Sequence, residues 1–162
     1  MAAVLQQSGR IFLATAVAAP PLYLAWGRGL PAWDTKAEPE PTNATRLVDE
    51  IGRRLITSVS YVVPDENGAI ELPDKKRYTV SVTQTKWLHV SWTFAYEDAA
   101  GETVREIGVF IGGTLVAGLP AGQRYFTAAQ VVEPGYCYCV EHVQAFKRGA
   151  GVRPVQQYVL PF

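Results

Sequence analysis

The chain has 162 residues, enough for one domain with a buried core, and its 48% hydrophobic and 19% charged content is typical of a folded protein. Fifteen Lys and Arg residues balance fifteen Asp and Glu residues, so no basic surface points to nucleic acid or to an anionic membrane as a partner. Fourteen Gly and eleven Pro residues recur between short β-prone runs, which favours strands and turns over a helical bundle.

A short helix is predicted over residues 8–18, where Ser8 can serve as the N-cap and apolar residues recur at helical spacing. The prolines at positions 20 and 21 end this helix. The apolar run before them is too short to span a bilayer, so no membrane insertion is expected. The next stretch, "LYLAWG" (residues 22–27), is predicted to be a strand that leads into an exposed loop rich in Pro and charge.

A second helix is predicted for "ATRLVDEIGRR", residues 44–54, because Thr42 or Asn43 can cap it and its apolar residues fall on one side. The following stretch "RLITSVSYVV", residues 54–63, is predicted to continue as a strand. These two elements connect the N-terminal helix and first strand to the rest of the sheet.

The clearest strand is "KWLHVSWTFAY", residues 86–96, in which apolar and polar side chains alternate as in a half-buried antiparallel strand. Further strands are expected at residues 76–85, 101–113 and 135–146. The predicted fold class is therefore α+β, a mostly antiparallel β-sheet with two short N-terminal helices, in one domain over residues 1–150.

The last twelve residues, 151–162, are predicted to form an extended assembly tail. Glycines at positions 149 and 151 loosen the chain before this segment, and two prolines remove backbone donors from it. It is nevertheless much more apolar than an ordinary solvated terminus. Its expected partner-binding residues are Val155, Tyr158, Val159, Leu160 and Phe162. The alternative is that the segment folds back as an edge strand on its own sheet.

No enzyme chemistry is expected. The chain has no G-x-S-x-G nucleophile motif and no phosphate-binding glycine loop, so neither catalytic residues nor a cofactor are predicted. Glu97, Asp98 and Glu102 are interpreted as solvated turn residues rather than as paired catalytic carboxylates. The four tryptophans offer an alternative function, a carbohydrate-binding β-domain, although aromatic residues in strands more often form the core. Trp33, in the Pro-rich loop, is the tryptophan expected to contact a partner, and the alternative is that it packs on its own domain.

No metal site is expected either. Cys137, Cys139 and His142 could supply three zinc ligands, but in an extended strand the two thiols point one way and the histidine the other. Residues two apart in a strand also lie near the outer limit for a disulfide, so both cysteines are predicted to be reduced.

One structural ion pair is predicted. Glu106 sits among apolar neighbours, and an isolated buried carboxylate is unfavourable. We therefore expect Glu106 to pair with Arg53 or Arg54 at the end of the second helix.

Three stretches, in chain order, resemble the N-terminal domain of myophage tail fibres, the tail-collar fibre family. They are "LVDEIGRRLITSV" (47–59), "AYEDAAGETVREIGVF" (95–110) and "GTLVAG" (113–118). The positions that match the helix motif of that family are Leu47, Val48, Glu50, Ile51 and Arg53, and those that match its strand motif are residues 105–110.

The resemblance implies a non-enzymatic structural protein of a tailed phage or phage-like particle. Tail fibres of that family continue into a long repetitive shaft, whereas this chain stops at Phe162. The resemblance therefore implies an adaptor at the baseplate or tail tip that attaches a separate fibre. Its expected partners are other baseplate or tail proteins, a tail fibre, and further copies of itself in a homo-oligomer. Its expected location is the virion, with assembly in the host cytoplasm.

Overall fold

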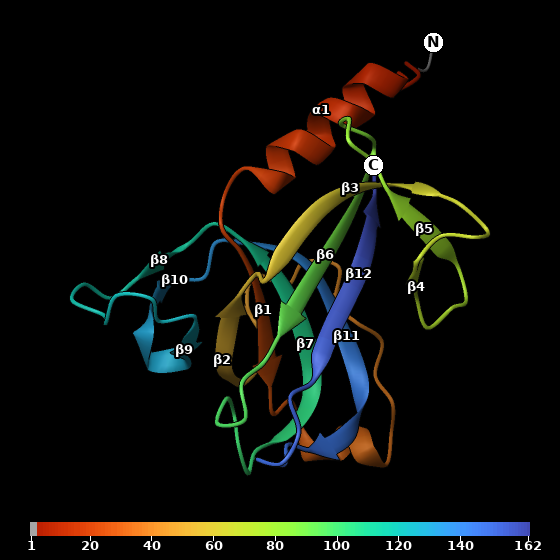
Figure 1. Ribbon diagram of the computed structural model, residues 1–162. Helices are drawn as coiled ribbons and strands as arrows, with labels where there is room; N and C mark the ends of the chain where they lie inside the picture. The colour runs from red at the N-terminus through yellow and green to blue at the C-terminus, as the bar shows by residue number, and fades with distance from the viewer. Residues whose placement is uncertain (1–2) are drawn as a thin grey trace. The chain divides into compact units, whose positions relative to one another are not determined.

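The computed structural model describes residues 3–162 as mostly antiparallel β-structure (Figure 1). The helical segments are α1 (Gln7–Ala18) and the short 3-10 helices η1 (Pro31–Asp34) and η2 (Ala128–Gln130). The strands are β1 (Leu22–Gly27), β2 (Glu50–Leu55), β3 (Ser58–Pro64), β4 (Ile70–Glu71), β5 (Arg77–Val80), β6 (Trp87–Thr93), β7 (Thr103–Ile111), β8 (Thr114–Leu115), β9 (Tyr125–Thr127), β10 (Val131–Glu133), β11 (Tyr136–Lys147) and β12 (Val155–Pro161). The predicted first helix and the mostly antiparallel sheet are confirmed, but the N-cap of the helix is Gln6 rather than Ser8.

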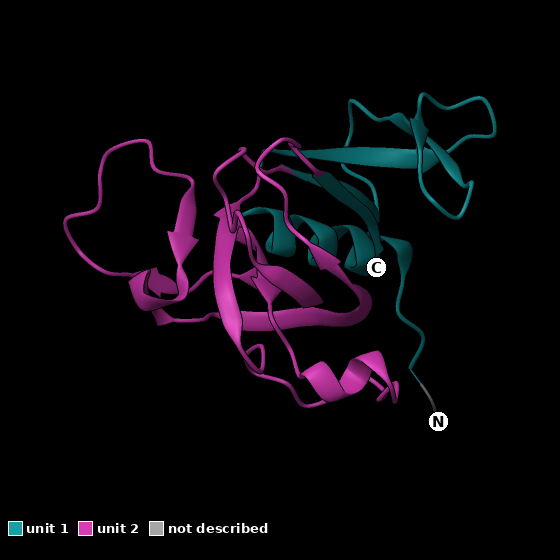
Figure 2. Ribbon diagram, turned by 90° about the horizontal axis from the view of Figure 1, so that it is seen from below, with its two compact units in different colours: residues 1–20, 57–92, 155–162 teal, residues 21–56, 93–154 magenta. Residues whose placement is uncertain are grey.

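The chain forms two compact units, each assembled from separate segments (Figure 2). Unit 1 contains residues 1–20, 57–92 and 155–162, and unit 2 contains residues 21–56 and 93–154. This division differs from the predicted boundary at residue 150. Antiparallel strands pair over long sequence separations here, so the units do not follow chain order.

Unit 2 is built on a five-stranded sheet in the order β11-β7-β1-β2-β9, in which every described pair is antiparallel. The central strand β1 is buried at all six positions, because β2 and β7 pair with its two edges and both of its faces are covered. A second, two-stranded sheet of β8 and β10 completes the unit.

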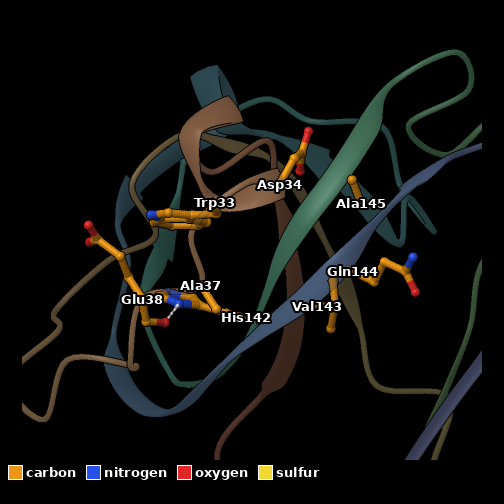
Figure 3. A pocket seen from close by; sticks show the side chains of 8 residues that line it. All are labelled: Trp33, Asp34, Ala37, Glu38, His142, Val143, Gln144 and Ala145. Carbon is orange, nitrogen blue, oxygen red and sulfur yellow. Dashed lines mark hydrogen bonds between the residues drawn. The ribbon is translucent and has the colours of Figure 1, made fainter.

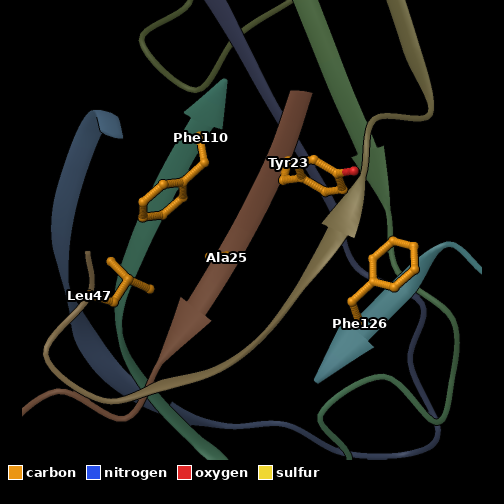
Figure 4. Packing of buried hydrophobic residues seen from close by; sticks show 5 residues of the cluster. All are labelled: Tyr23, Ala25, Leu47, Phe110 and Phe126. Atoms are coloured by element: carbon orange, nitrogen blue, oxygen red, sulfur yellow. The ribbon is translucent and has the colours of Figure 1, made fainter. Parts of the chain in front are cut away.

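Alternate side chains of β1 point to opposite faces of the sheet and pack in two separate apolar clusters. Tyr23 and Ala25 belong to a buried cluster to which four segments contribute, formed by Tyr23, Ala25, Leu47, Phe110 and Phe126 (Figure 4). Trp26 has the opposite parity in the strand and stacks on Phe94, with 3.6 Å between ring centroids and 8° between planes. Both aromatic rings are fully buried.

The second predicted helix is wrong. Residues 50–54 belong to β2, which pairs with β1 on one side and with β9 on the other. Gly52 shows why the strand is favoured, because a Cβ atom there would lie 2.5 Å from the Tyr125 hydroxyl and 2.6 Å from the Phe126 carbonyl oxygen. Glycine weakens a helix interior and permits this close approach of β9. The tertiary pairing therefore overrides the helical spacing of the apolar residues.

Unit 1 contains α1 and a five-stranded sheet in the order β12-β6-β3-β5-β4. Strand β6 shows the predicted alternation, with Leu88, Val90 and Trp92 buried and the residues between them partly exposed. Helix α1 is linked to the sheet by the Tyr61 hydroxyl on β3, which donates a hydrogen bond to Thr15 Oγ1 at 3.2 Å.

The C-terminal segment is the long edge strand of this sheet, which is the alternative that the sequence left open. The Phe162 backbone N–H donates to the Lys86 carbonyl at 3.0 Å, and the Gln157 side chain lies 3.3 Å from His89 Nε2. These contacts show that β12 runs antiparallel to β6 (Figure 1). Residues 155–161 are thus part of the sheet of unit 1 rather than a separate tail.

We expect Gly27→Ala to destabilise the protein by roughly 1–3 kcal/mol. A Cβ atom at this position in β1 would lie 2.3 Å from Glu106 Oε1 and 2.4 Å from its Cγ, so the buried glutamate must move. Urea unfolding measures the change. Gly149→Ala is the matched control, because a Cβ atom there would have nothing within 4 Å. Equal loss of stability in both variants would contradict this account.

Candidate functional site

Glu106 on β7 is 1% exposed, and its carboxylate accepts two backbone hydrogen bonds. The Val48 N–H donates to Oε2 at 3.1 Å and the Asp49 N–H donates to Oε1 at 3.0 Å. The predicted ion pair with Arg53 or Arg54 is therefore wrong, because the partners of this carboxylate are backbone N–H groups. Because Val48 and Asp49 are not helical, their N–H groups need partners outside a helix, and the carboxylate supplies them.

Arg53 pairs instead with Glu50, its neighbour on β2. Nε and Nη2 of the guanidinium donate to the two carboxylate oxygens at 2.8 Å each, and Nη1 donates to the Pro134 carbonyl at 2.7 Å. The guanidinium carbon lies 4.3 Å from the centroid of the Phe110 ring. With four polar and aromatic contacts, this 1% exposed cation is fully accommodated inside unit 2.

Arg54 pairs with Asp98, in the turn before β7. The same Asp98 carboxylate accepts the Ala95 N–H at 2.7 Å, and the residue is only 3% exposed. The interpretation of Asp98 as a solvated turn residue is thus wrong. The Asp98 carboxylate thus accepts a hydrogen bond from the turn and also pairs with an arginine of β2.

Two further arginines tie the loop after β1 to the start of β7. Arg28 binds Glu102 through Nε at 2.8 Å and Nη2 at 2.7 Å, and it binds Asp49 through Nη1 at 3.1 Å. Arg105 binds both carboxylate oxygens of Asp34 at 2.8 Å. The hydrogen bond from Arg28 lowers the pKa of Glu102, and the hydrogen bond from Arg105 lowers the pKa of Asp34.

Trp33 lies on η1 beside a pocket of about 380 Å³, whose lining is Trp33, Asp34, Ala37, Glu38, His142, Val143, Gln144 and Ala145 (Figure 3). Its ring stacks on the His142 imidazole, with centroids 4.1 Å apart and planes inclined by 24°. Gly29 approaches the ring so closely that a Cβ atom there would lie 2.3 Å from the indole carbon Cζ3. Packing within unit 2 thus occupies much of the Trp33 surface.

His142 holds the rest of this loop against β11. Its backbone N–H donates to Glu40 Oε1 at 3.1 Å, and its Nδ1 lies 2.8 Å from the Glu38 carbonyl oxygen. The loop of residues 36–40 therefore covers the middle of the β11 edge. The sequence carried no signal for this contact, which joins residues more than 100 positions apart.

The tryptophans do not gather on one surface. Trp26 and Trp92 are 0% exposed, and Trp33 is stacked on His142. Trp87 is partly buried beside the Tyr78 ring. A sugar-stacking platform needs open aromatic faces, so this arrangement does not favour the carbohydrate-binding alternative.

Cys137 and Cys139 are free cysteines on β11. Burial raises the pKa of both thiols, which favours the protonated, less reactive form. Within residues 3–162 no cluster of three or more His, Cys, Asp or Glu side chains could hold a metal ion. In the same range, no helix has the length and apolar character required to cross a membrane.

The predicted partner-binding residues of β12 fall into different environments. Leu160 is 6% exposed, and the Tyr158 ring packs edge-on against Trp92 at 6.3 Å between centroids. Val155, at the start of the strand, is 55% exposed, whereas Val159 and Phe162 are partly buried. Leu160 and Tyr158 thus serve the unit's own packing, and Val155 presents an apolar side chain to solvent.

The whole described chain matches one family model. A model described as "Baseplate wedge 3 tail fiber network component" matches residues 2–162. The chain belongs to this family. It is therefore a structural protein of the bacteriophage tail, located at the baseplate of the virion. No curated protein is similar enough to count as a match.

We expect Glu106→Ala to reduce the free energy of unfolding by roughly 2–4 kcal/mol, because it leaves two N–H groups in unit 2 without their acceptor. Glu106→Gln keeps one oxygen acceptor and should lose about half as much. The matched control is Glu102→Ala, which removes a half-exposed ion pair at a cost of about 1 kcal/mol or less. Urea unfolding compares the three. A near-normal stability for Glu106→Ala would contradict the assigned role.

The Glu102–Arg28 pair predicts a loss of stability in acid. Because the pKa of Glu102 is lowered by folding, the folded state binds fewer protons than the unfolded state. The contribution is complete above about pH 4.5, the ordinary value for this group, and is lost as the pH falls through the lowered value. The effect should be roughly 0.5 kcal/mol at most, since the pair is partly exposed. Urea titrations at pH 7 and pH 3 should show a smaller difference for Glu102→Gln than for the native protein; equal differences would contradict this.

Proposed function

We propose that this protein is a non-enzymatic adaptor that attaches a tail fibre to the baseplate wedge. Membership of a baseplate wedge and tail fibre network family supports this proposal, as does the likeness of residues 105–110, in strand β7, to the strand motif of tail-collar fibre domains. In this proposal several copies assemble in the host cytoplasm with other baseplate proteins and hold the fibre by geometry, without bond chemistry.

The observation that carries the proposal is the apolar surface of unit 1. Among the described residues, nine large hydrophobic side chains of this unit are exposed: Val4, Leu5, Phe12, Leu13, Val59, Val63, Val80, Val82 and Val155. Of the residues of this unit that the structure describes, seven hydrophobic ones are buried: Ala14, Val62, Tyr78, Leu88, Val90, Trp92 and Leu160. These exposed side chains are apolar positions that contacts with other chains could cover.

Unit 2 has the opposite balance. It buries fourteen hydrophobic residues and exposes seven large ones. Its interior also contains the bidentate Arg53–Glu50 pair and the Arg54–Asp98 pair, which fix the positions of β2 and of the turn before β7. We assign unit 2 the role of a rigid frame and unit 1 the role of the contact surface.

Within unit 1, the edge strand β12 is the surface that we assign to the fibre. The sheet has two edges, and β12 has seven residues whereas β4 at the other edge has two. A longer edge offers more backbone groups to an added strand, and Val155 adds an exposed apolar side chain. Trp33 is assigned to contacts with baseplate neighbours through its loop, where the ring itself is held by His142.

We expect Val155→Asp to leave stability within about 0.5 kcal/mol of the native value while reducing the number of fibres per particle. A charge at an apolar contact must be desolvated without a partner, which weakens attachment. Electron microscopy of complemented particles counts the fibres, and thermal unfolding of the purified protein checks stability. Val152→Asp is the matched control, because Val152 is 61% exposed but lies outside β12. A normal fibre count with Val155→Asp would overturn the assignment.

A further inference from the structure

Helix α1 is scarcely buried by its own chain. Ala14 is the only buried residue that it has, and the exposed fractions of Phe12 and Leu13 are 70% and 41%. A helix of twelve residues is marginal in water without tertiary packing. The largest of these exposed side chains, Phe12, lies at the middle of the helix, whose bounds are Gln7–Ala18.

The outward face of α1 is uncharged and built of one large residue between small ones. Ser8, Phe12, Ala16 and Ala19 recur at spacings of three and four, and all are exposed. At the N-terminal end Leu5 folds over Gly9, where its Cδ1 would lie 3.0 Å from an added Cβ atom. Arg10 is the only charged residue among residues 3–20, and helical geometry places it away from this face.

We infer that α1 pairs antiparallel with α1 of a second copy of this chain, on a twofold axis at Phe12. A twofold axis brings the same side chain of each copy together, so the central Phe12 meets its equivalent. The axis also sets Ser8 opposite Ala16 of the second copy. Small residues therefore flank the Phe12 pair on both sides, which lets the two helices approach closely.

The helix dipole favours an antiparallel second copy of α1 over a parallel one. Helix α1 has no acidic residue in its first turn, no basic residue in its last turn and no side-chain hydrogen bond at its N-cap. Its dipole is therefore uncompensated at both ends. In an antiparallel pair each positive N-terminus lies beside a negative C-terminus, so the second copy supplies the charge that the sequence lacks.

The pair is expected to be weak in dilute solution and stable in the particle. A helix of this length spans about 18 Å, so the contact is smaller than the roughly 1,200 Å² of a typical stable complex. Copies held close together in one baseplate have a high effective concentration, which compensates for a small contact. The inference thus rests on the proposed oligomer within the particle and names its contact, but it does not depend on fibre attachment.

Two single-cysteine variants test the geometry. Both are made in a background with Cys137→Ser and Cys139→Ser, one with Ser8→Cys and the other with Ala16→Cys, and each is treated with a short bismaleimide. Neither variant alone should cross-link, because equivalent positions lie about 12 Å apart along an antiparallel pair. An equal mixture of the two should give a covalent dimer on a denaturing gel, both at high protein concentration and in assembled baseplates.

Phe12→Asp in both partners of the mixture should abolish the covalent dimer, whereas Phe12→Leu should retain it. Cross-linking of each single variant with itself would overturn the antiparallel arrangement. Absence of a dimer from the mixture, in solution and in baseplates, would overturn the pairing itself. Fibre counts on the same particles report the Val155 surface separately, so the two proposals can fail independently.

Discussion

The buried carboxylate of Glu106 is the constraint on which the rest of unit 2 depends. It lies on β7 opposite Gly27, the last residue of β1, and hydrogen bonds from the N–H groups of Val48 and Asp49 offset the cost of its burial. Those two residues directly precede β2, so the position of β2 follows from that of β7. Only glycine at position 27 leaves room for the carboxylate beside β1. A single buried charge thereby sets the relative positions of three strands.

Two arginines of unit 2, Arg28 and Arg105, fix the position of the loop that follows β1. Arg28 ties Asp49 to Glu102, and Arg105 ties Asp34 to β7, so the loop after β1 is held at both of its ends. Partly exposed pairs of this kind contribute little stability individually. In the Arg28–Glu102 and Arg105–Asp34 pairs, each guanidinium donates two hydrogen bonds to one carboxylate. This bidentate geometry fixes the relative position of the two side chains. These pairs therefore fix the position of the loop more than they stabilise the fold.

The sequence predicted the strands with a clear two-residue period and failed where contacts across the sheet decide the structure. Alternation in residues 86–96 and 101–113 identified β6 and β7, because side-chain direction in a strand depends only on local geometry. Leu47, Val48 and Ile51 fit a helix equally well by spacing. The pairing of Gly52 with Trp26 and Thr127 overrides that spacing. Nothing local reveals which strands will flank residue 52.

In the candidate site, too, the features set by local sequence were predicted and those set by distant contacts were not. Glu106 was identified as a buried carboxylate from its apolar neighbours, which is local information. Its partners could not be deduced, because a carboxylate accepts hydrogen bonds from backbone N–H groups as readily as from arginine. In a helix, the N–H groups of Val48 and Asp49 would instead donate to carbonyl groups one turn earlier. The wrong helix at residues 44–54 and the wrong partner for Glu106 are therefore one error, since both follow from the conformation assigned to Val48 and Asp49.

Prolines at the two ends of β12 limit the length of the contact that we propose at this exposed edge. Pro154 precedes the strand and Pro161 ends it, and neither has an N–H to donate to a strand added alongside. An added strand can therefore pair only with the few residues between the prolines, which limits the contact in length. Open-ended stacking of sheets requires two long complementary edges, and β4 at the opposite edge has only two residues. A short β4 therefore leaves β12 without a long complementary edge on the same sheet, so head-to-tail stacking of copies through these two edges is not favoured.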